Sequence, residues 1–112
     1  MFEKFRLIPV LLLKDRGLYK SVKFNKLSYI GDPINTINLF NELEVDELII
    51  LDINLSKSKQ EVDIEYIKNI SSEAFMPISY GGGIKNYETA RNILDCGIEK
   101  LVINNSVIDN FE

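Results

Sequence analysis

The sequence predicts an α/β fold with a parallel sheet, of the (βα)8 barrel class, and two observations carry this prediction. First, apolar runs typical of buried strands alternate with amphipathic helical segments, which indicates βαβ units with right-handed crossovers. Second, the units repeat: the segment starting at Val45 resembles the segment starting at Ile98, and the segment from Ile8 resembles the segment from Met76. Such a repeat is typical of barrels built by duplication.

The length sets how much of a barrel to expect. The 112 residues accommodate one domain, residues 1–112, with about four βα units. A closed barrel needs eight strands and roughly 250 residues. We therefore expect half of a barrel, whose sheet keeps one face uncovered. Either the chain is a fragment, or half barrels self-associate so that two copies cover that face.

The first third of the chain is expected to hold a strand, a hairpin and a helix. Residues 7–13 form a continuous apolar run, typical of a strand buried on both faces. The segment "RGLYKSVKFNKL" alternates in polarity and predicts an extended, hairpin-like excursion. Asp32 as N-cap and Pro33 at the first helical position predict a helix start. The expected apolar stripe of this helix consists of Ile34, Ile37, Leu39, Phe40 and Leu43.

The remaining segments continue the alternation. A strand is expected in "DELIILDINL", and a helix in "SKSKQEVDIEYIKNISSEA", with Val62, Ile64, Ile67 and Ile70 facing inward. "FMPISYGGG" predicts a third strand. A helix is expected in "NYETARNILDCG", with Asn86 as N-cap and Gly97 as its C-terminal stop. "IEKLVINNSV" predicts the fourth strand.

Composition and charge narrow the classes of function. The net charge is −4 with a pI near 4.9, and the basic residues are scattered, which argues against nucleic-acid binding. The apolar run near the N-terminus is too short to cross a bilayer, so we expect no membrane segment and a cytoplasmic location. No metal-ligand spacing or cofactor motif is present in the sequence, which has no histidine. Cys96 favours a buried structural thiol over a nucleophile, because no histidine could activate it.

Three places at predicted strand ends could carry chemistry. Gly81, Gly82 and Gly83 lead from the third strand to a helix, where exposed backbone amides could bind phosphate; a tight turn that needs positive φ is the alternative. Asn104 and Asn105 offer side-chain donors after the fourth strand, or cap a following helix. Asp52 follows a buried strand, at the rim where barrel active sites lie; a solvated carboxylate is the alternative.

Several short segments, taken in their order along the chain, resemble a known protein family. "RLIPV", "LKDRG", "GDP", "DELIILDI", "PISYGGGI" and "EKLVIN" together resemble the cyclase subunit of imidazole glycerol phosphate synthase, a (βα)8 barrel of histidine biosynthesis. The resemblance covers essentially all of this chain and the N-terminal half of that family. It implies a glutaminase partner docked at the N-terminal face of the strands. Ammonia from this partner crosses the barrel and reacts with a bis-phosphorylated aminoimidazole carboxamide ribonucleotide, giving imidazole glycerol phosphate and AICAR.

The resemblance also implies roles for individual residues. Gly81 to Gly83, Asn104 and Asn105 fall in the phosphate site of this half, although Asn105 stands where the family usually has threonine. Asp52 matches the strand-two aspartate at the substrate end, and Lys20 matches the lysine of the family's first loop.

A second set of matches lies at the opposite end of the strands. Arg6, Glu47 and Lys100 match three members of a charged ring at the bottom of the barrel, through which ammonia passes. From the residues alone, a salt-bridge ring that only stabilises the barrel is the alternative.

One departure falls on the first strand. The family has an aspartate there as general acid/base, whereas this chain has Leu12, which cannot transfer a proton. Asp15 lies three residues further on, outside the strand, and is not assigned the role. The second catalytic aspartate of the family belongs to the fifth strand, beyond this chain. Enzyme activity is therefore left open by the sequence.

Three functional hypotheses follow. The "LLLK" run, "YIGDP" and "PISYGGGIK" resemble a branch of the family that supplies ammonia for sugar amidation in surface-polysaccharide biosynthesis, and this is the preferred reading. The second is an authentic histidine-pathway cyclase. The third is a non-catalytic half barrel that binds phosphate or only folds and self-associates.

Overall fold

The computed structural model describes residues 6–14, 17–22, 26–53 and 62–103. In chain order the elements are β1 (Val10–Lys14), β2 (Gly17–Val22), β3 (Lys26–Gly31), α1 (Pro33–Leu43), β4 (Leu48–Asp52), α3 (Ile64–Glu73), β5 (Ile78–Gly81), α4 (Tyr87–Asp95) and β6 (Lys100–Val102).

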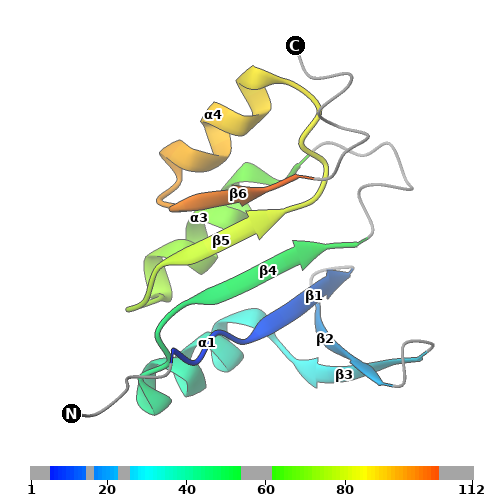
Figure 1. Cartoon of the computed structure of the whole chain (residues 1–112), viewed down its shortest axis with the longest axis vertical. Helices are drawn as coiled ribbons and strands as arrows, with labels where there is room; N and C mark the ends of the chain where they lie inside the picture. The colour runs from blue at the N-terminus through cyan, green and yellow to red at the C-terminus, as the bar shows by residue number, and fades with distance from the viewer. Residues whose placement is uncertain (1–5, 15–16, 23–25, 54–61, 104–112) are drawn as a thin grey trace.

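All described strands belong to one sheet with the order β3-β2-β1-β4-β5-β6 (Figure 1). β1, β4, β5 and β6 run parallel to one another, while β2 and β3 form an antiparallel hairpin that pairs with the other edge of β1. The hairpin predicted from the alternating segment is thus confirmed. The four parallel strands confirm the predicted α/β fold and are consistent with part of a (βα)8 barrel.

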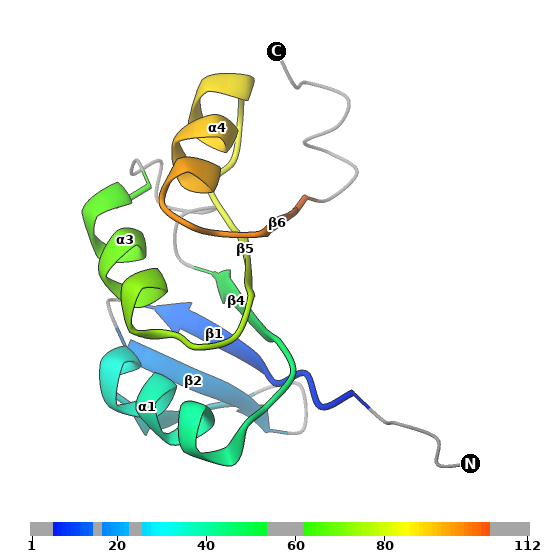
Figure 2. The same cartoon turned by 90° about the vertical axis from the view of Figure 1, so that its left-hand side faces the viewer.

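The helices lie on one side of this sheet. Figure 2 shows α1, α3 and α4 together on the same face. Along each strand the side chains alternate between faces, and the buried ones point to the helices. These core residues include Leu11 and Leu13 of β1, Leu48 and Ile50 of β4, Ile78 and Tyr80 of β5, and Ile37, Ile67 and Ile93 of the helices. Each fully buried aliphatic side chain contributes roughly 1.5–3 kcal/mol to stability.

The opposite face of the parallel strands carries apolar side chains that no described helix covers. They are Val10 and Leu12 of β1, Ile49 and Leu51 of β4, and Val102 of β6. Val10 is 51% exposed and Val102 41%. In a closed barrel this face points to the interior, which explains why apolar residues occupy both faces of the strands.

The start of α1 agrees with the sequence, whereas its apolar stripe does not. Asp32 accepts a hydrogen bond from the main-chain N–H of Asn35, and Pro33 follows as the first helical residue. The helix buries Pro33, Thr36 and Ile37, while Leu39 and Leu43 are more than half exposed. The prediction that those two leucines face inward was wrong, because Leu39 lies about 200° around the helix from Ile37.

Two further expectations need correction. The second helix was expected to include Val62, but α3 begins at Ile64, because the Asp63 carboxylate accepts the Tyr66 N–H as an N-cap. Ile67 and Ile70 are buried as predicted. Cys96 is half-buried rather than buried, and its thiol donates to the carbonyl oxygens of Asn92 and Ile64 at 3.2 and 3.6 Å.

The last helix agrees with the sequence at both ends. Asn86 caps α4 by accepting the Thr89 N–H at 2.8 Å, and Gly97 follows the helix with a φ of 105°. This left-handed conformation ends the helix at low cost only for glycine.

Candidate functional site

The carboxyl ends of the parallel strands meet at one edge of the sheet, and three of the predicted site residues lie there. Leu12 is on β1, Asp52 ends β4 and Gly81 ends β5. The register pairs Leu13 with Asp52 and Leu51 with Gly81, so the three strand ends are immediate neighbours. Parallel α/β proteins bind ligands at this edge.

Leu12 lies on the uncovered face of the sheet. Its register neighbours are Leu51 on β4 and Tyr19 on β2, and the Leu12 side chain is half-buried. The Leu12 and Leu51 side chains carry no group that can gain or lose a proton. The position that the family resemblance assigns to a catalytic acid is therefore part of an apolar strip.

Asp52 lies on the other face. Because it pairs with Leu13 and follows Ile50 by two residues, its side chain belongs to the helix-covered side of β4. There the Tyr80 hydroxyl donates to Oδ2 of Asp52 at 3.4 Å. The structure thus does not bring the side chains of Leu12 and Asp52 together, and it gives Asp52 a partner from β5.

Tyr80 is almost fully buried, and its environment affects its ionisation. Burial, followed by the neighbouring Asp52 carboxylate, raises the pKa of Tyr80 well above its ordinary value of 10.0. A neutral hydroxyl is the form that can donate to a carboxylate, so the hydrogen bond to Asp52 adds to the effect of burial on the pKa of Tyr80. Tyr80 was not predicted as a site residue, although its position two residues after Ile78 would have placed it on the helix-covered face.

Replacing Tyr80 with phenylalanine is expected to reduce the loss of stability at alkaline pH. In the unfolded chain Tyr80 ionises near pH 10, whereas in the folded chain its pKa is raised. Its contribution to stability is therefore complete below about pH 10 and declines as the pH rises above that value. Tyr80→Phe also removes the hydrogen bond, worth about 1 kcal/mol. Urea unfolding between about pH 8 and about pH 11 measures both effects.

Tyr87→Phe is the matched control, because Tyr87 is 60% exposed. The control should keep the wild-type decline above pH 10. An unchanged decline in Tyr80→Phe would contradict the assignment.

The three consecutive glycines at the end of β5 have steric reasons to be glycine. Gly82 and Gly83 have φ angles of 122° and 70°. A Cβ on Gly81 would lie 2.8 Å from the Val102 carbonyl oxygen, and a Cβ on Gly82 would overlap the Asp52 carbonyl oxygen. The turn and its close approach to both neighbouring strands account for all three residues. Phosphate binding by this segment stays a prediction.

The other residues predicted for this end of the sheet are only partly placed. Lys20 lies on β2 opposite Ser28, and the structure does not describe its side chain. Asn104 and Asn105 lie outside the described residues.

At the opposite edge of the sheet, the structure brings Arg6, Glu47 and Lys100 together. Oε1 of Glu47 lies 3.1 Å from Nη2 of Arg6 and 3.2 Å from Nζ of Lys100. The Glu47 side chain is 16% exposed, whereas the two cations are about 60% exposed. Such partly exposed pairs contribute only about 0–1 kcal/mol each. Their contribution to stability therefore does not account well for the presence of three charged side chains where the strands begin.

The main chain holds this edge in place. Asp46 accepts the Leu7 N–H with its carboxylate at 2.6 Å and donates its own N–H to the Leu7 carbonyl at 2.9 Å. These two bonds fix the segment before β1 against the segment before β4. Arg6 and Glu47 adjoin Leu7 and Asp46 in the chain, so this bridge positions both of them.

Neither a metal-binding cluster nor a membrane-spanning helix occurs in the part of the chain that the structure describes. Within residues 6–14, 17–22, 26–53 and 62–103, no group of three or more carboxylate or cysteine side chains could hold a metal ion. None of the helices described there is long and apolar enough to cross a membrane.

Comparison with known proteins extends over nearly the whole chain. A family profile described as histidine biosynthesis protein matches residues 6–112. A Pseudomonas aeruginosa protein provisionally named imidazole glycerol phosphate synthase subunit hisF2 is 56% identical over 103 residues, which are 92% of this chain and 41% of that protein. A Methanococcus vannielii protein named imidazole glycerol phosphate synthase subunit HisF is 38% identical over 107 residues, which are 96% of this chain and 39% of that protein. The chain thus spans about two-fifths of the length of these relatives.

Proposed function

This chain belongs to the histidine biosynthesis protein family, and we propose that it works as part of a cyclase-subunit-like barrel that receives ammonia from a glutaminase partner. The partner binds at the N-terminal ends of the strands. The observation that carries this proposal is the Glu47 carboxylate, which contacts both Arg6 and Lys100 at that edge. Residues 1–112 act in it as one domain, the N-terminal half of the barrel.

The charged cluster fits a passage for a small polar molecule. Glu47 is largely shielded while its two cations reach into solvent. A carboxylate held between two cations can accept hydrogen bonds from ammonia without a change in its own charge. Because all three side chains sit where the strands begin, ammonia that passes them reaches the uncovered face, which becomes the interior in a closed barrel.

We further propose that the ammonia is used for sugar amidation in surface-polysaccharide biosynthesis and that cyclisation is lost. Leu12 supports this, because a positioned acid/base contributes about 10²–10⁴-fold to a reaction and leucine contributes none of it. At the edge where the carboxyl ends of the strands meet, a phosphorylated small molecule would bind. The residues proposed to bind it are Lys20, Asp52, Gly81 to Gly83, Asn104 and Asn105. The proposed setting is the cytoplasm.

A second candidate is an authentic histidine-pathway cyclase that makes imidazole glycerol phosphate and AICAR. The 38% identity to the Methanococcus vannielii protein, named as a synthase subunit, favours it. A non-catalytic half barrel that binds phosphate or self-associates is the third candidate. The exposed Val10 and Val102 on the uncovered face favour it.

Complementation of a histidine auxotroph separates the first two candidates. We expect the product of the complete gene to leave the auxotroph without growth in the absence of histidine, because Leu12 replaces the acid/base. The Methanococcus vannielii protein serves as the positive control. Growth supported by this gene at the level of the control would contradict the ammonia-delivery proposal and favour the histidine-pathway cyclase.

A further inference from the structure

The glycine turn (Gly81 to Gly83) is the segment that the proposed function assigns to a phosphate group, and its neighbours hold it closely. Gly82 packs so tightly on Asp52 that an added Cβ would lie 2.8 Å from the Asp52 Cβ. After the turn, the Ile84 side chain is 3% exposed and anchors the chain in the core before α4 begins. The main-chain amides of the turn are therefore fixed relative to Asp52.

The Asp52 carboxylate places a negative charge beside this turn. It is attached to the same Cβ that packs on Gly82. Two like unit charges about 4 Å apart repel each other enough to weaken binding about fivefold even in bulk water. A phosphate group at the turn is therefore bound well only if the Asp52 carboxylate points away from it.

Tyr80 controls where this carboxylate points. The Tyr80 hydroxyl donates to Oδ2 of Asp52 at 3.4 Å, on the helix-covered face of the sheet. Tyr80 is 2% exposed, and a buried hydroxyl needs a hydrogen-bond partner. Asp63 also lies near enough to raise the pKa of Tyr80, but the Asp63 carboxylate accepts the Tyr66 N–H as the cap of α3. Asp52 is thus the acceptor that the Tyr80 hydroxyl holds.

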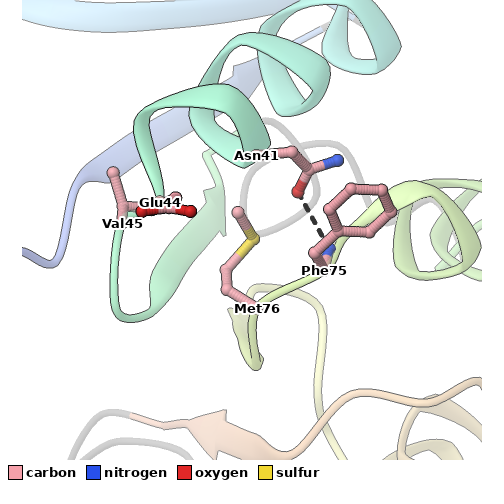
Figure 3. Close-up of a pocket in the computed structure, with 5 residues that line it drawn as sticks. All are labelled: Asn41, Glu44, Val45, Phe75 and Met76. Atoms are coloured by element: carbon pink, nitrogen blue, oxygen red, sulfur yellow. Dashed lines mark hydrogen bonds between the residues drawn. The ribbon is translucent and has the colours of Figure 1, made fainter.

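A hollow at the opposite edge of the sheet is a poor alternative site for phosphate (Figure 3). It has a volume of about 320 Å³ and is lined by Asn41, Glu44, Val45, Phe75 and Met76. Figure 3 shows the Phe75 N–H donating to Oδ1 of Asn41, at a distance of 2.8 Å. None of these five side chains is basic, and Glu44 brings a negative charge that repels an anion. The glycine turn is therefore the better place for a phosphate group.

We propose that Tyr80 is a positioning residue for phosphate binding, because its hydroxyl keeps the Asp52 carboxylate away from the glycine turn. The inference rests on the proposed function, which places a phosphorylated small molecule at this edge, and it adds the residue that controls the charge there. Tyr80 itself does not touch the ligand, since it is buried on the helix-covered face. Asp52 contributes through the main chain and Cβ that pack on the turn, and its charge is held aside.

The test titrates inorganic phosphate into the isotope-labelled 112-residue chain and follows the main-chain amide signals of the glycine turn by NMR. Wild type is expected to show saturable shifts of these signals. Tyr80→Phe should bind phosphate about fivefold more weakly, because the Asp52 carboxylate loses this donor and can turn toward the anion. Tyr87→Phe is the matched control, since it removes the hydroxyl of a tyrosine that is 60% exposed, and it should bind like wild type.

A change of charge at residue 52 separates positioning from packing. Adding Asp52→Asn to Tyr80→Phe keeps the size of the side chain but removes its charge, so affinity should return to within about twofold of wild type. A loss that persists in the double variant would mean that Tyr80 acts through packing, and this would overturn the inference. Asp52→Asn alone tests the charge with Tyr80 in place. It should bind phosphate at least as tightly as wild type, and weaker binding would also overturn the inference.

The remaining outcomes distinguish the inference from the proposed function. Equal affinity of wild type and Tyr80→Phe would overturn the inference and leave phosphate binding at the turn intact. No saturable shift of the turn in wild type would overturn both the inference and the phosphate binding on which it rests. Equal shifts with sodium chloride at the same ionic strength would count as that second result, because they would show no preference for phosphate.

Discussion

Gly82→Ala is expected to lower the free energy of unfolding by more than about 3 kcal/mol. The substitution adds a Cβ that would overlap the carbonyl oxygen of Asp52 and lie 2.8 Å from the Asp52 Cβ. These atoms belong to the backbone and the root of a side chain at the end of β4, so they cannot swing aside. The φ angle of 122° adds strain of about 1–3 kcal/mol for any residue with a Cβ.

Gly31→Ala provides a matched control for the strain alone. Its φ is 135°, and its added Cβ would lie 3.6 Å from the Thr36 hydroxyl oxygen, an ordinary contact. We expect Gly31→Ala to cost about 1–2 kcal/mol. Urea unfolding followed by circular dichroism gives both values, and their difference isolates the clash with Asp52. Equal losses would show that β4 and β5 are less tightly packed at this end than described.

The result also bears on why three glycines occur in a row. From the sequence, the run exceeded the needs of a simple turn and therefore raised the possibility of a phosphate loop. The structure supplies a packing reason, because Gly81 faces Val102 and Gly82 faces Asp52 on the two neighbouring strands. A large loss in Gly82→Ala would show that packing alone requires glycine there. Phosphate binding then has to be demonstrated by its own titration.

The sequence predicted those parts of the fold that depend on neighbouring residues. The caps at Asp32 and Asn86 and the stop at Gly97 each act within one helical turn, so their residue types are sufficient to locate them. The apolar strands were equally clear, because both of their faces are apolar. Leu39 was misplaced because the side of a helix that faces the sheet is set by tertiary packing.

The candidate site was less predictable because its contacts join distant segments. The Tyr80 hydroxyl and Asp52 are 28 residues apart, and Asn41 and the Phe75 amide are 34 residues apart. Neither pair leaves a local pattern in the sequence. The family resemblance named Arg6, Glu47 and Lys100, but their meeting at one carboxylate oxygen is a property of the folded chain. The family resemblance also named Asp52, but it did not indicate on which face of the sheet the Asp52 carboxylate lies.

Leu12→Asp is expected to raise ammonia-dependent turnover of the bis-phosphorylated ribonucleotide by about 10² to 10⁴-fold, the usual contribution of a positioned acid/base. The assay uses a complete barrel, because this chain spans about two-fifths of the length of the relatives it matches and barrel active sites draw residues from several strands. Ammonium salt replaces the glutaminase, so a defect in docking cannot hide the result. Leu12 faces the uncovered side of the sheet, where the new carboxylate could reach a substrate.

Two controls separate proton transfer from a change of shape or polarity. Leu12→Asn has nearly the same size as the aspartate variant but no acid/base, and it should turn over the ribonucleotide no faster than wild type. Leu51→Asp places a carboxylate on the same face of the neighbouring strand, paired with residue 12 in the register, and should also be no faster than wild type. Each substitution costs about 1 kcal/mol of apolar burial, which thermal unfolding can verify. Equal activity of Leu12→Asp and Leu12→Asn would mean that more than this one group separates the chain from a cyclase. Activity in Leu12→Asp alone would show that the loss of cyclisation lies in a single side chain of β1.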